Sequence, residues 1–267
     1  MINNLKVGAD PELFLITESG VPYPACGKIG GTKEEPLYFT DRGHAVQEDN
    51  VAVEFCIPPS SSSVELAENI STCLDHIKLI KPAGTVISRA ASLYFRPEDL
   101  QSDQARLFGC NATFNHWTLR MNRSPKSETN LRTCGGHIHL GWDSPEEKDC
   151  LDVLAALELF LGVPSIIMDT DTERRKLYGK SGEFRFKPYG VEWRVLSNFW
   201  IFSPIHISWV WEGVKRAVDF VNSGNSVDKS TVKDVINIIN TSNTVKAREL
   251  CEHYNIMHFT HKIISVI

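Results

Sequence analysis

Several features that would assign this chain to a familiar class are missing from its sequence. Its 267 residues include 28 lysines and arginines against 33 acidic residues, so no excess of positive charge favours nucleic acid as a partner. The cysteines form no CxxC pair, and they are odd in number and widely spaced. Reduced thiols therefore fit better than a disulfide framework. No repeat or low-complexity tract divides the chain.

Long apolar runs are also scarce. The longest uncharged run, Val195–Trp211, is too short and too polar to span a bilayer comfortably. At the start of the chain, Asp10 and Glu12 interrupt the stretch where the apolar core of a secretory signal would lie. We therefore predict a cytoplasmic protein that has no membrane partner.

Helix signals occur at several places. Ser62 and Glu65 have capping-box spacing and predict a helix that runs to about residue 78. The run Ser144-Pro145-Glu146-Glu147 predicts a second helix start with proline at the first helical position, and Gly162 and Pro164 predict its end after about residue 161. Further helices are expected around 204–221, 229–240 and 243–253.

Strand-like segments are expected around 12–17, 44–56, 84–95, 134–142, 183–188 and 190–196. The turn Pro188-Tyr189-Gly190 predicts that the last two form an antiparallel hairpin. Strands and helices follow no regular βαβ alternation, so we predict an α+β fold in which a curved, largely antiparallel sheet carries helices on its outer face. Residues 1–202 would form the catalytic domain, and 203–267 a helical part packed on it.

Three segments place two polar residues around one apolar or ring residue: Asp10-Pro11-Glu12, His137-Ile138-His139 and Glu192-Trp193-Arg194. Because side chains alternate along a strand, each pair would face one side of the sheet. Glu54 stands alone between two apolar residues, and Glu183, Arg185 and Lys187 alternate along another strand. The sequence therefore predicts one apolar sheet face under helices and one face that carries carboxylates, imidazoles and guanidinium groups.

Clustered Asp, Glu and His suit Mg²⁺ or Mn²⁺, and adjacent arginines suit phosphate, so the combination favours ATP chemistry. Each motif has an ordinary structural alternative. The HxH motif can be a structural pair, the ExR motif an exposed ion pair, and Asp10-Pro11-Glu12 a turn or helix start.

Read in order, the segments resemble the phage-encoded amidoligases, the carboxylate–amine ligase type 2 family, a branch of the glutamine synthetase and glutamate–cysteine ligase superfamily. The resemblance covers about the first 200 residues. The matching stretches are GADPELF (8–14), GGTKEEP (30–36), QEDNVAVEFCIPP (47–59), LRTCGGHIHLGW (131–142) and DTERRKLYGKSGEFRFKPYGVEWRVLSNFW (171–200).

The resemblance implies a role for each matching residue. The expected metal ligands are Asp10, Glu12, Glu54, His137 and Glu192, with Asp49 and Glu48 as further candidates if they are not simply residues of a solvated turn. The expected catalytic residues beside Glu192 are Arg194, Arg175 and Arg185. Nucleotide or phosphate contacts are expected from His139, Arg174, Lys187 and Lys33, the last in a loop with Gly30 and Gly31.

The implied reaction is ATP-dependent amide formation through an acyl phosphate, with ATP and Mg²⁺ or Mn²⁺ required. Its substrates would be small molecules or peptides bearing a carboxylate and an amine, in the host cytoplasm if the protein is phage-encoded. One departure stands out: the family follows FGC with Asp-Pro-Asp, whereas Asn111-Ala112-Thr113 stands here. Two other functions stay open: a metal-dependent hydrolase, and a catalytically reduced binding protein that acts on a host component.

Two further groups of residues, cysteines and histidines, have side chains that can take part in catalysis or metal binding. Neither Cys134 nor Cys110 has a base at a recognisable spacing, so neither is expected to be a catalytic nucleophile. Five further histidines are expected to be structural or surface residues: His116, His206, His253, His258 and His261.

Overall fold

A computed structural model describes residues 1–106, 113–122 and 129–256. Antiparallel pairs build all of its described sheets. The largest has six strands, in the order β1 (Lys6–Ala9), β13 (Ile138–Gly141), β15 (Gly190–Trp193), β14 (Glu183–Lys187), β10 (Phe114–Asn115) and β11 (Arg120–Met121). A second has four strands, in the order β2 (Glu12–Leu13), β7 (Ala52–Cys56), β6 (Ala45–Asp49) and β5 (Leu37–Tyr38).

Two small sheets complete the strands. One has the order β4 (Pro22–Tyr23), β3 (Leu15–Thr17) and β8 (Thr85–Ile87), and the other pairs β12 (Leu131–Thr133) with β9 (Ser92–Tyr94). The predicted hairpin is confirmed, because β14 and β15 pair antiparallel with Lys187 opposite Gly190. The predicted mixture of helices and antiparallel strands is confirmed as well.

The two larger sheets are joined along residues 7–12. The backbone N–H of Phe55 donates to the carbonyl of Pro11 (3.1 Å), and that of Ile57 donates to the carbonyl of Ala9 (3.2 Å). The chain after β7 therefore continues alongside β1, with a final bridge between Val7 and Ser60. The backbone thus runs from one sheet into the other at the point where the acidic motif lies.

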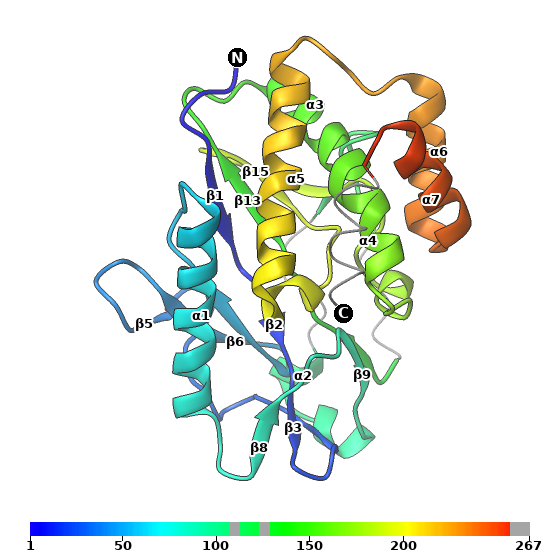
Figure 1. Cartoon of the computed structure of the whole chain (residues 1–267). Coiled ribbons are helices and arrows are strands. Elements are labelled where there is room, and N and C mark those ends of the chain that lie inside the picture. Colours follow the sequence, from blue (N-terminus) through cyan, green and yellow to red (C-terminus); the bar gives the residue numbers. More distant parts are fainter. Residues whose placement is uncertain (107–112, 123–128, 257–267) are drawn as a thin grey trace.

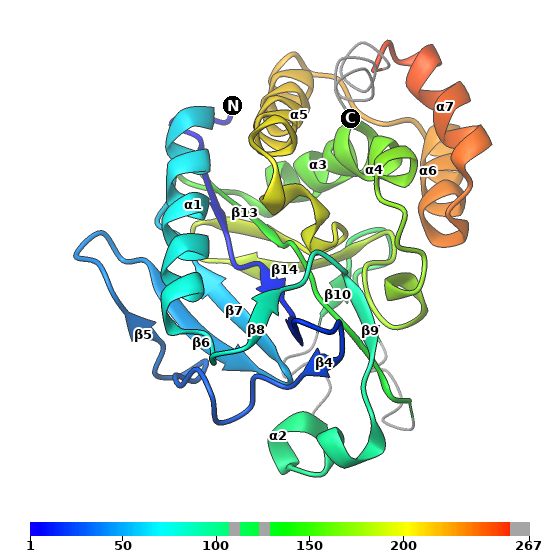
Figure 2. The same ribbon diagram turned by 60° about the horizontal axis from the view of Figure 1, so that its bottom comes forward.

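Helices cover one side of this joined sheet, as Figure 2 shows for α1, α3, α4 and α5. The described helices are α1 (Ser63–Ile80), α2 (Asp103–Arg106), α3 (Glu147–Leu157), α4 (Val163–Met168), α5 (Pro204–Asn222), α6 (Lys229–Thr241) and α7 (Thr244–His253). Helix α5 packs against α1 and α3, while α6 and α7 pack beside α4 (Figure 1). The three helices predicted after residue 203 are therefore present.

The sheet has one apolar and one polar face, as the alternation of its residues predicts. Ile138 and Trp193 are fully buried in the main hydrophobic core, which residues from the helices share. Their strand neighbours His137, His139 and Glu192 alternate with them and point to the opposite side.

The predicted start and end of the second helix are wrong. Ser144 has a left-handed backbone (φ 50°), and α3 begins only at Glu147, with no side-chain cap. At the other end, a π-helical turn, Glu158–Gly162, leads directly into α4. A Cβ on Gly162 would lie 2.8 Å from Ile239, so this glycine permits close packing of α6. Pro164 falls in the first turn of α4, where a missing N–H costs little.

The joined helical stretch Glu147–Met168 has the length and hydropathy of a membrane span, but 78% of its apolar window is buried inside the protein. A mostly buried core helix of a soluble protein passes the same test.

Candidate active site

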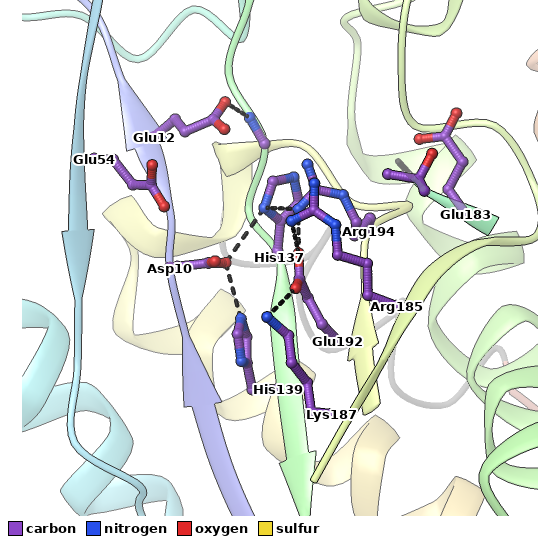
Figure 3. Close-up of polar contacts among 12 residues, drawn as sticks. Asp10, Glu12, Glu54, His137, His139, Glu183, Arg185, Lys187, Glu192 and Arg194 are labelled. Atoms are coloured by element: carbon purple, nitrogen blue, oxygen red, sulfur yellow. Dashed lines mark hydrogen bonds and ion pairs between the residues drawn. The ribbon is translucent and has the colours of Figure 1, made fainter. Parts of the chain in front are cut away.

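The acidic motif near the N-terminus divides between two clusters. Residues 10 and 11 lie between β1 and β2, so Asp10 and Glu12 do not share one face of a single strand as predicted. Asp10 faces the histidines of β13, whereas Glu12 lies opposite Glu54 in the β2–β7 pair. The two carboxylates therefore belong to separate groups on either side of the sheet junction (Figure 3).

The first acidic group consists of Asp10, His139 and Glu192, whose nearest ligand-type atoms lie within 4.8 Å of one another. Asp10 Oδ1 lies 3.1 Å from His139 Nε2 and 3.3 Å from His137 Nδ1. Burial alone would raise the pKa of Asp10, but His139 and His137 outweigh it and hold that pKa well below its usual range. Asp10 is therefore an anion at neutral pH.

Three cationic side chains surround Glu192, which is fully buried. Lys187 Nζ lies 2.7 Å from one carboxylate oxygen and Arg185 Nη1 3.1 Å from the other, to which Arg194 also donates. Burial and the charge of Asp10 oppose ionisation of Glu192, but Arg194 and the two histidines outweigh them and lower its pKa to about 2. The strand motifs on β14 and β15 thus converge on one charged centre.

The second acidic group consists of Glu12, Asp49 and Glu54, again with ligand-type atoms within 4.8 Å. Lys33 approaches it, with Nζ 2.8 Å from Asp49 and 3.9 Å from Glu54. Burial and then the charge of Asp49 raise the pKa of Glu12 to about 7, and burial also raises that of Glu54. Three acidic side chains with one nearby lysine form an environment that favours a bound cation.

The ring of His137 packs against Gly135, two residues before it in the chain. A Cβ on Gly135 would lie 2.1 Å from His137 Nε2, so only glycine leaves room for the ring. Arg194 Nη1 lies 3.2 Å from His137 Nδ1, and burial and then the charge of Arg194 lower the pKa of His137 to about 4. The lowered pKa leaves His137 neutral at neutral pH, with its Nδ1 between Arg194 Nη1 and Asp10 Oδ1.

His139 has a different environment. Its Nδ1 lies 2.5 Å from the hydroxyl of Tyr189, the middle residue of the β14–β15 turn, and its Nε2 faces Asp10. The compact acidic group therefore contains His139, whereas the family resemblance implied that His137 is the ligand. Tyr189 was not identified from the sequence, where it was read only as a turn residue.

The arginines of the 174–175 pair take different positions. Arg174 is buried and donates to the backbone carbonyls of Val195 (2.9 Å) and Arg194 (3.2 Å), but it still lines a hollow at the site. Arg175 donates to the carbonyl of Asp171 (3.1 Å) and lines neither hollow of the site. The structure thus does not bring Arg175 together with the other candidate residues.

Two hollows meet at these groups. The larger, of about 760 Å³, contains Asp10, Glu54, His139 and Lys187 in its lining, a size typical of small-molecule sites. The smaller, of about 60 Å³, lies against Asp49. Five candidate residues line both hollows: Glu12, Lys33, His137, Arg185 and Arg194.

Several other sequence candidates prove to be structural. Glu48 accepts hydrogen bonds from the backbone N–H groups of residues 27–30, so it holds that loop and leaves ligation to Asp49. Burial raises the pKa of Cys134 well above its usual value, as befits an unreactive thiol. His116 pairs with Glu158 (3.2 Å) inside the protein, and His206 contacts Phe199.

Some candidates lie outside the described residues: Cys110, Asn111, Ala112, His258 and His261. His253 lies at the end of α7, away from the two acidic groups.

Residues 127–218 match the model of a protein family described as phage phiEco32-like COOH.NH2 ligase-type 2. The family resemblance is confirmed over this stretch, which is about a third of the chain. The stretch matched by the ligase family model includes β13, β14 and β15, and with them His137, His139, Glu192 and Arg194.

A search of curated proteins found no match. Among solved structures, a bifunctional glutathione synthetase from Pasteurella multocida is similar to 94% of this chain, with a TM-score of 0.47 and 10% sequence identity. The similarity covers 49% of that protein, so this chain spans about half its length.

Proposed function

We propose that this protein is a carboxylate–amine ligase that depends on ATP and on a divalent cation, Mg²⁺ or Mn²⁺. The main support is the convergence of two acidic groups and three cationic side chains at two adjoining hollows. The ligase family match supports the reaction class. The proposed fold type is that of glutamine synthetase and glutamate–cysteine ligase.

The donor atoms of the two acidic groups fit divalent cations. Asp10 Oδ1 and His139 Nε2 are buried and face each other at 3.1 Å, and the buried Glu54 Oε2 has Lys33 Nζ only at 3.9 Å. Glu12, Asp49 and Glu54 offer only oxygen, which suits Mg²⁺, and the group with His139 suits Mn²⁺ as well. A bound cation would neutralise phosphate oxygens, which is the chemistry that phosphoryl transfer requires.

The three basic side chains around Glu192 can also bind phosphate in this reaction. Arg185, Lys187 and Arg194 surround Glu192 and line the larger hollow, where their charges can also bind an oxyanion. Arg185 and Arg194 line the smaller hollow as well. Guanidinium groups bind phosphate and carboxylate oxygens in pairs and stay charged at all relevant pH values. We assign these three residues to the phosphate groups of ATP and to the charge that develops during transfer.

The proposed reaction has two steps. An oxygen of the substrate carboxylate attacks the γ-phosphorus of ATP, and ADP leaves with the electron pair of the broken P–O bond. The nitrogen of an amine then attacks the acyl carbon, phosphate leaves, and the amine loses a proton. Positioning and preorganised charge provide most of the acceleration, because no covalent enzyme intermediate is needed.

Binding of a non-hydrolysable ATP analogue tests the nucleotide assignment directly. Titration calorimetry should show binding in Mg²⁺ or Mn²⁺ that disappears when EDTA removes the cation. Absence of binding in the presence of either cation would contradict the proposal and favour a metal-dependent hydrolase. Release of ADP that depends on a carboxylate and an amine together would then establish ligation, and its absence for every pair tested would favour a catalytically reduced binding protein.

A further inference from the structure

The smaller hollow contains two buried polar groups without partners. The hydroxyl of Tyr178 and Nε of Arg174 are both buried, and among the described residues neither has a hydrogen-bond partner. Both residues line this hollow, and neither lines the larger one. A buried donor left unsatisfied costs about 1–3 kcal/mol, so such groups in a native protein call for an acceptor.

The backbone around these groups holds them in place. Two terminal nitrogens of Arg174 bind the carbonyls of Val195 and Arg194, which fixes the guanidinium plane. The N–H of Tyr178 donates to the carbonyl of Arg174 (2.8 Å). Gly179 has φ of 76°, and a Cβ there would overlap the Arg174 guanidinium. The Arg174 guanidinium and the backbone of Tyr178 are therefore held in place.

The protonation state of Tyr178 makes it a donor. Burial and then the charge of Glu12 raise the pKa of Tyr178 far above neutrality, so the hydroxyl keeps its proton. The Tyr178 hydroxyl and the Nε–H of Arg174 are therefore both hydrogen-bond donors at the small hollow. A bound group with acceptor oxygens would supply the partners that these donors lack.

Size and charge restrict what such a group can be. A volume of about 60 Å³ exceeds the space that one water molecule needs but takes only a few heavy atoms. The lining favours an anion, because it contains Lys33, Arg132, Arg174, Arg185 and Arg194 against two carboxyl groups, Glu12 and Asp49. A planar carboxylate fits so small a volume better than the larger tetrahedral phosphate.

We propose that the small hollow is the subsite for the carboxylate of the acyl substrate, and that Tyr178 determines the position and selection of that carboxylate. The assignment of the carboxylate as a substrate rests on the proposed ligase function. The five residues that line both hollows would then contact ATP in the larger hollow and the carboxylate in the smaller one. The subsite itself is a binding property that can be measured without turnover.

Acetate and inorganic phosphate serve as probes, each titrated into the full-length protein by calorimetry in a chloride background with Mg²⁺ present. The wild type should bind acetate in preference to phosphate. Tyr178→Phe removes one oxygen and keeps the ring, and it should weaken acetate binding about tenfold or more, while Mn²⁺ affinity stays unchanged. Tyr94→Phe removes an exposed hydroxyl that bonds Glu173, and this control should match the wild type.

The outcomes are distinct. Equal acetate affinity in Tyr178→Phe and Tyr94→Phe would overturn the proposal, and so would a wild type that binds neither probe, since water would then satisfy the donors. Preference for phosphate with the same loss in Tyr178→Phe would overturn the carboxylate assignment and make the hollow a phosphate subsite. Acetate binding through Tyr178 in a protein that binds no ATP analogue would uphold the subsite and reject the ligase function.

Discussion

Glu12 and Glu54 are direct partners in the β2–β7 ladder, and both carboxyl groups are buried on the same side of the sheet. Like charges at opposite positions of an antiparallel pair destabilise it. Their proximity to Asp49 adds a third acidic group. The fold therefore carries an electrostatic cost at this point, which protonation or a bound cation relieves.

Replacing Glu54 with glutamine should separate metal affinity from stability. The variant loses one oxygen ligand and one negative charge, so we expect Mn²⁺ affinity to fall about 10- to 100-fold. The metal-free protein should unfold at the same or a higher temperature than the wild type, because repulsion with Glu12 is removed. Calorimetric Mn²⁺ titration and thermal unfolding in EDTA measure the two effects.

The exposed Glu68 on α1 provides the matched control, and Glu68→Gln should change neither quantity. Unchanged Mn²⁺ affinity in Glu54→Gln would remove Glu54 from the metal site.

The stability of the metal-free protein should depend on pH in a characteristic direction. The pKa of Glu12 is raised to about 7 in the folded protein, so the folded state binds a proton more tightly than the unfolded state does. Stability contributed by this proton is present below the ordinary pKa of a glutamate and is lost as pH rises to about 7. The loss is at most about 1.4 kcal/mol per pH unit for one such group.

A divalent cation should reverse this trend, because it binds the deprotonated carboxylates. The increase in melting temperature caused by Mn²⁺ over EDTA should therefore grow between pH 5 and pH 8. Titration of Asp10 does not contribute to this pH dependence, because its lowered pKa lies below this pH range. An increase that is the same at every pH would show that the Glu12 carboxyl does not take part in metal binding.

Glu192→Gln should destabilise the protein and abolish turnover. The variant leaves Arg185, Lys187 and Arg194 close together without their carboxylate, and breaking a buried ion pair in this way costs about 3–5 kcal/mol. Turnover should fall by about 10²- to 10³-fold or more, since a preorganised charge contact is lost. Urea unfolding and ATP-dependent activity of the folded fraction give the two values.

Glu98→Gln breaks an exposed pair with Arg96 and should cost no more than about 1 kcal/mol. If Glu192→Gln were as stable and as active as Glu98→Gln, both the charged centre and its catalytic role would be refuted.

Gly135→Ala should displace the His137 ring. The new Cβ would lie 2.1 Å from His137 Nε2, so the imidazole must move and its contact with Arg194 is lost. Gly8→Ala in the neighbouring strand is the control, because a Cβ there meets the Cβ of His139 at an ordinary 3.6 Å. We expect a clear loss of thermal stability and activity only for Gly135→Ala, and equal behaviour of the two variants would contradict this geometry.

The alternation of apolar and polar residues predicted which residues of the His137–His139 and Glu192–Arg194 segments share a face of the sheet. In HIH and EWR the apolar central residues, Ile138 and Trp193, are fully buried, and the polar residues at both ends point to the other face. This outcome follows from local backbone geometry, since side chains alternate in any strand. The predicted helix N-caps were only partly correct. The hydroxyl of Ser62 accepts a hydrogen bond from the backbone N–H of Glu65, as predicted. Ser144 is not an N-cap, because α3 begins three residues later.

The charged residues, their alternation along the strands and the family signature can be read from the order of amino acids. Their grouping depends on the tertiary structure: Asp10 joins His139 while Glu12 joins Asp49, because the backbone crosses from one sheet to the other between them. The tertiary structure also brought Tyr178 to the small hollow, where no local pattern places it. Alternation specifies which side a residue faces, but the partner across a ladder depends on the pairing and register of strands that lie far apart in the chain.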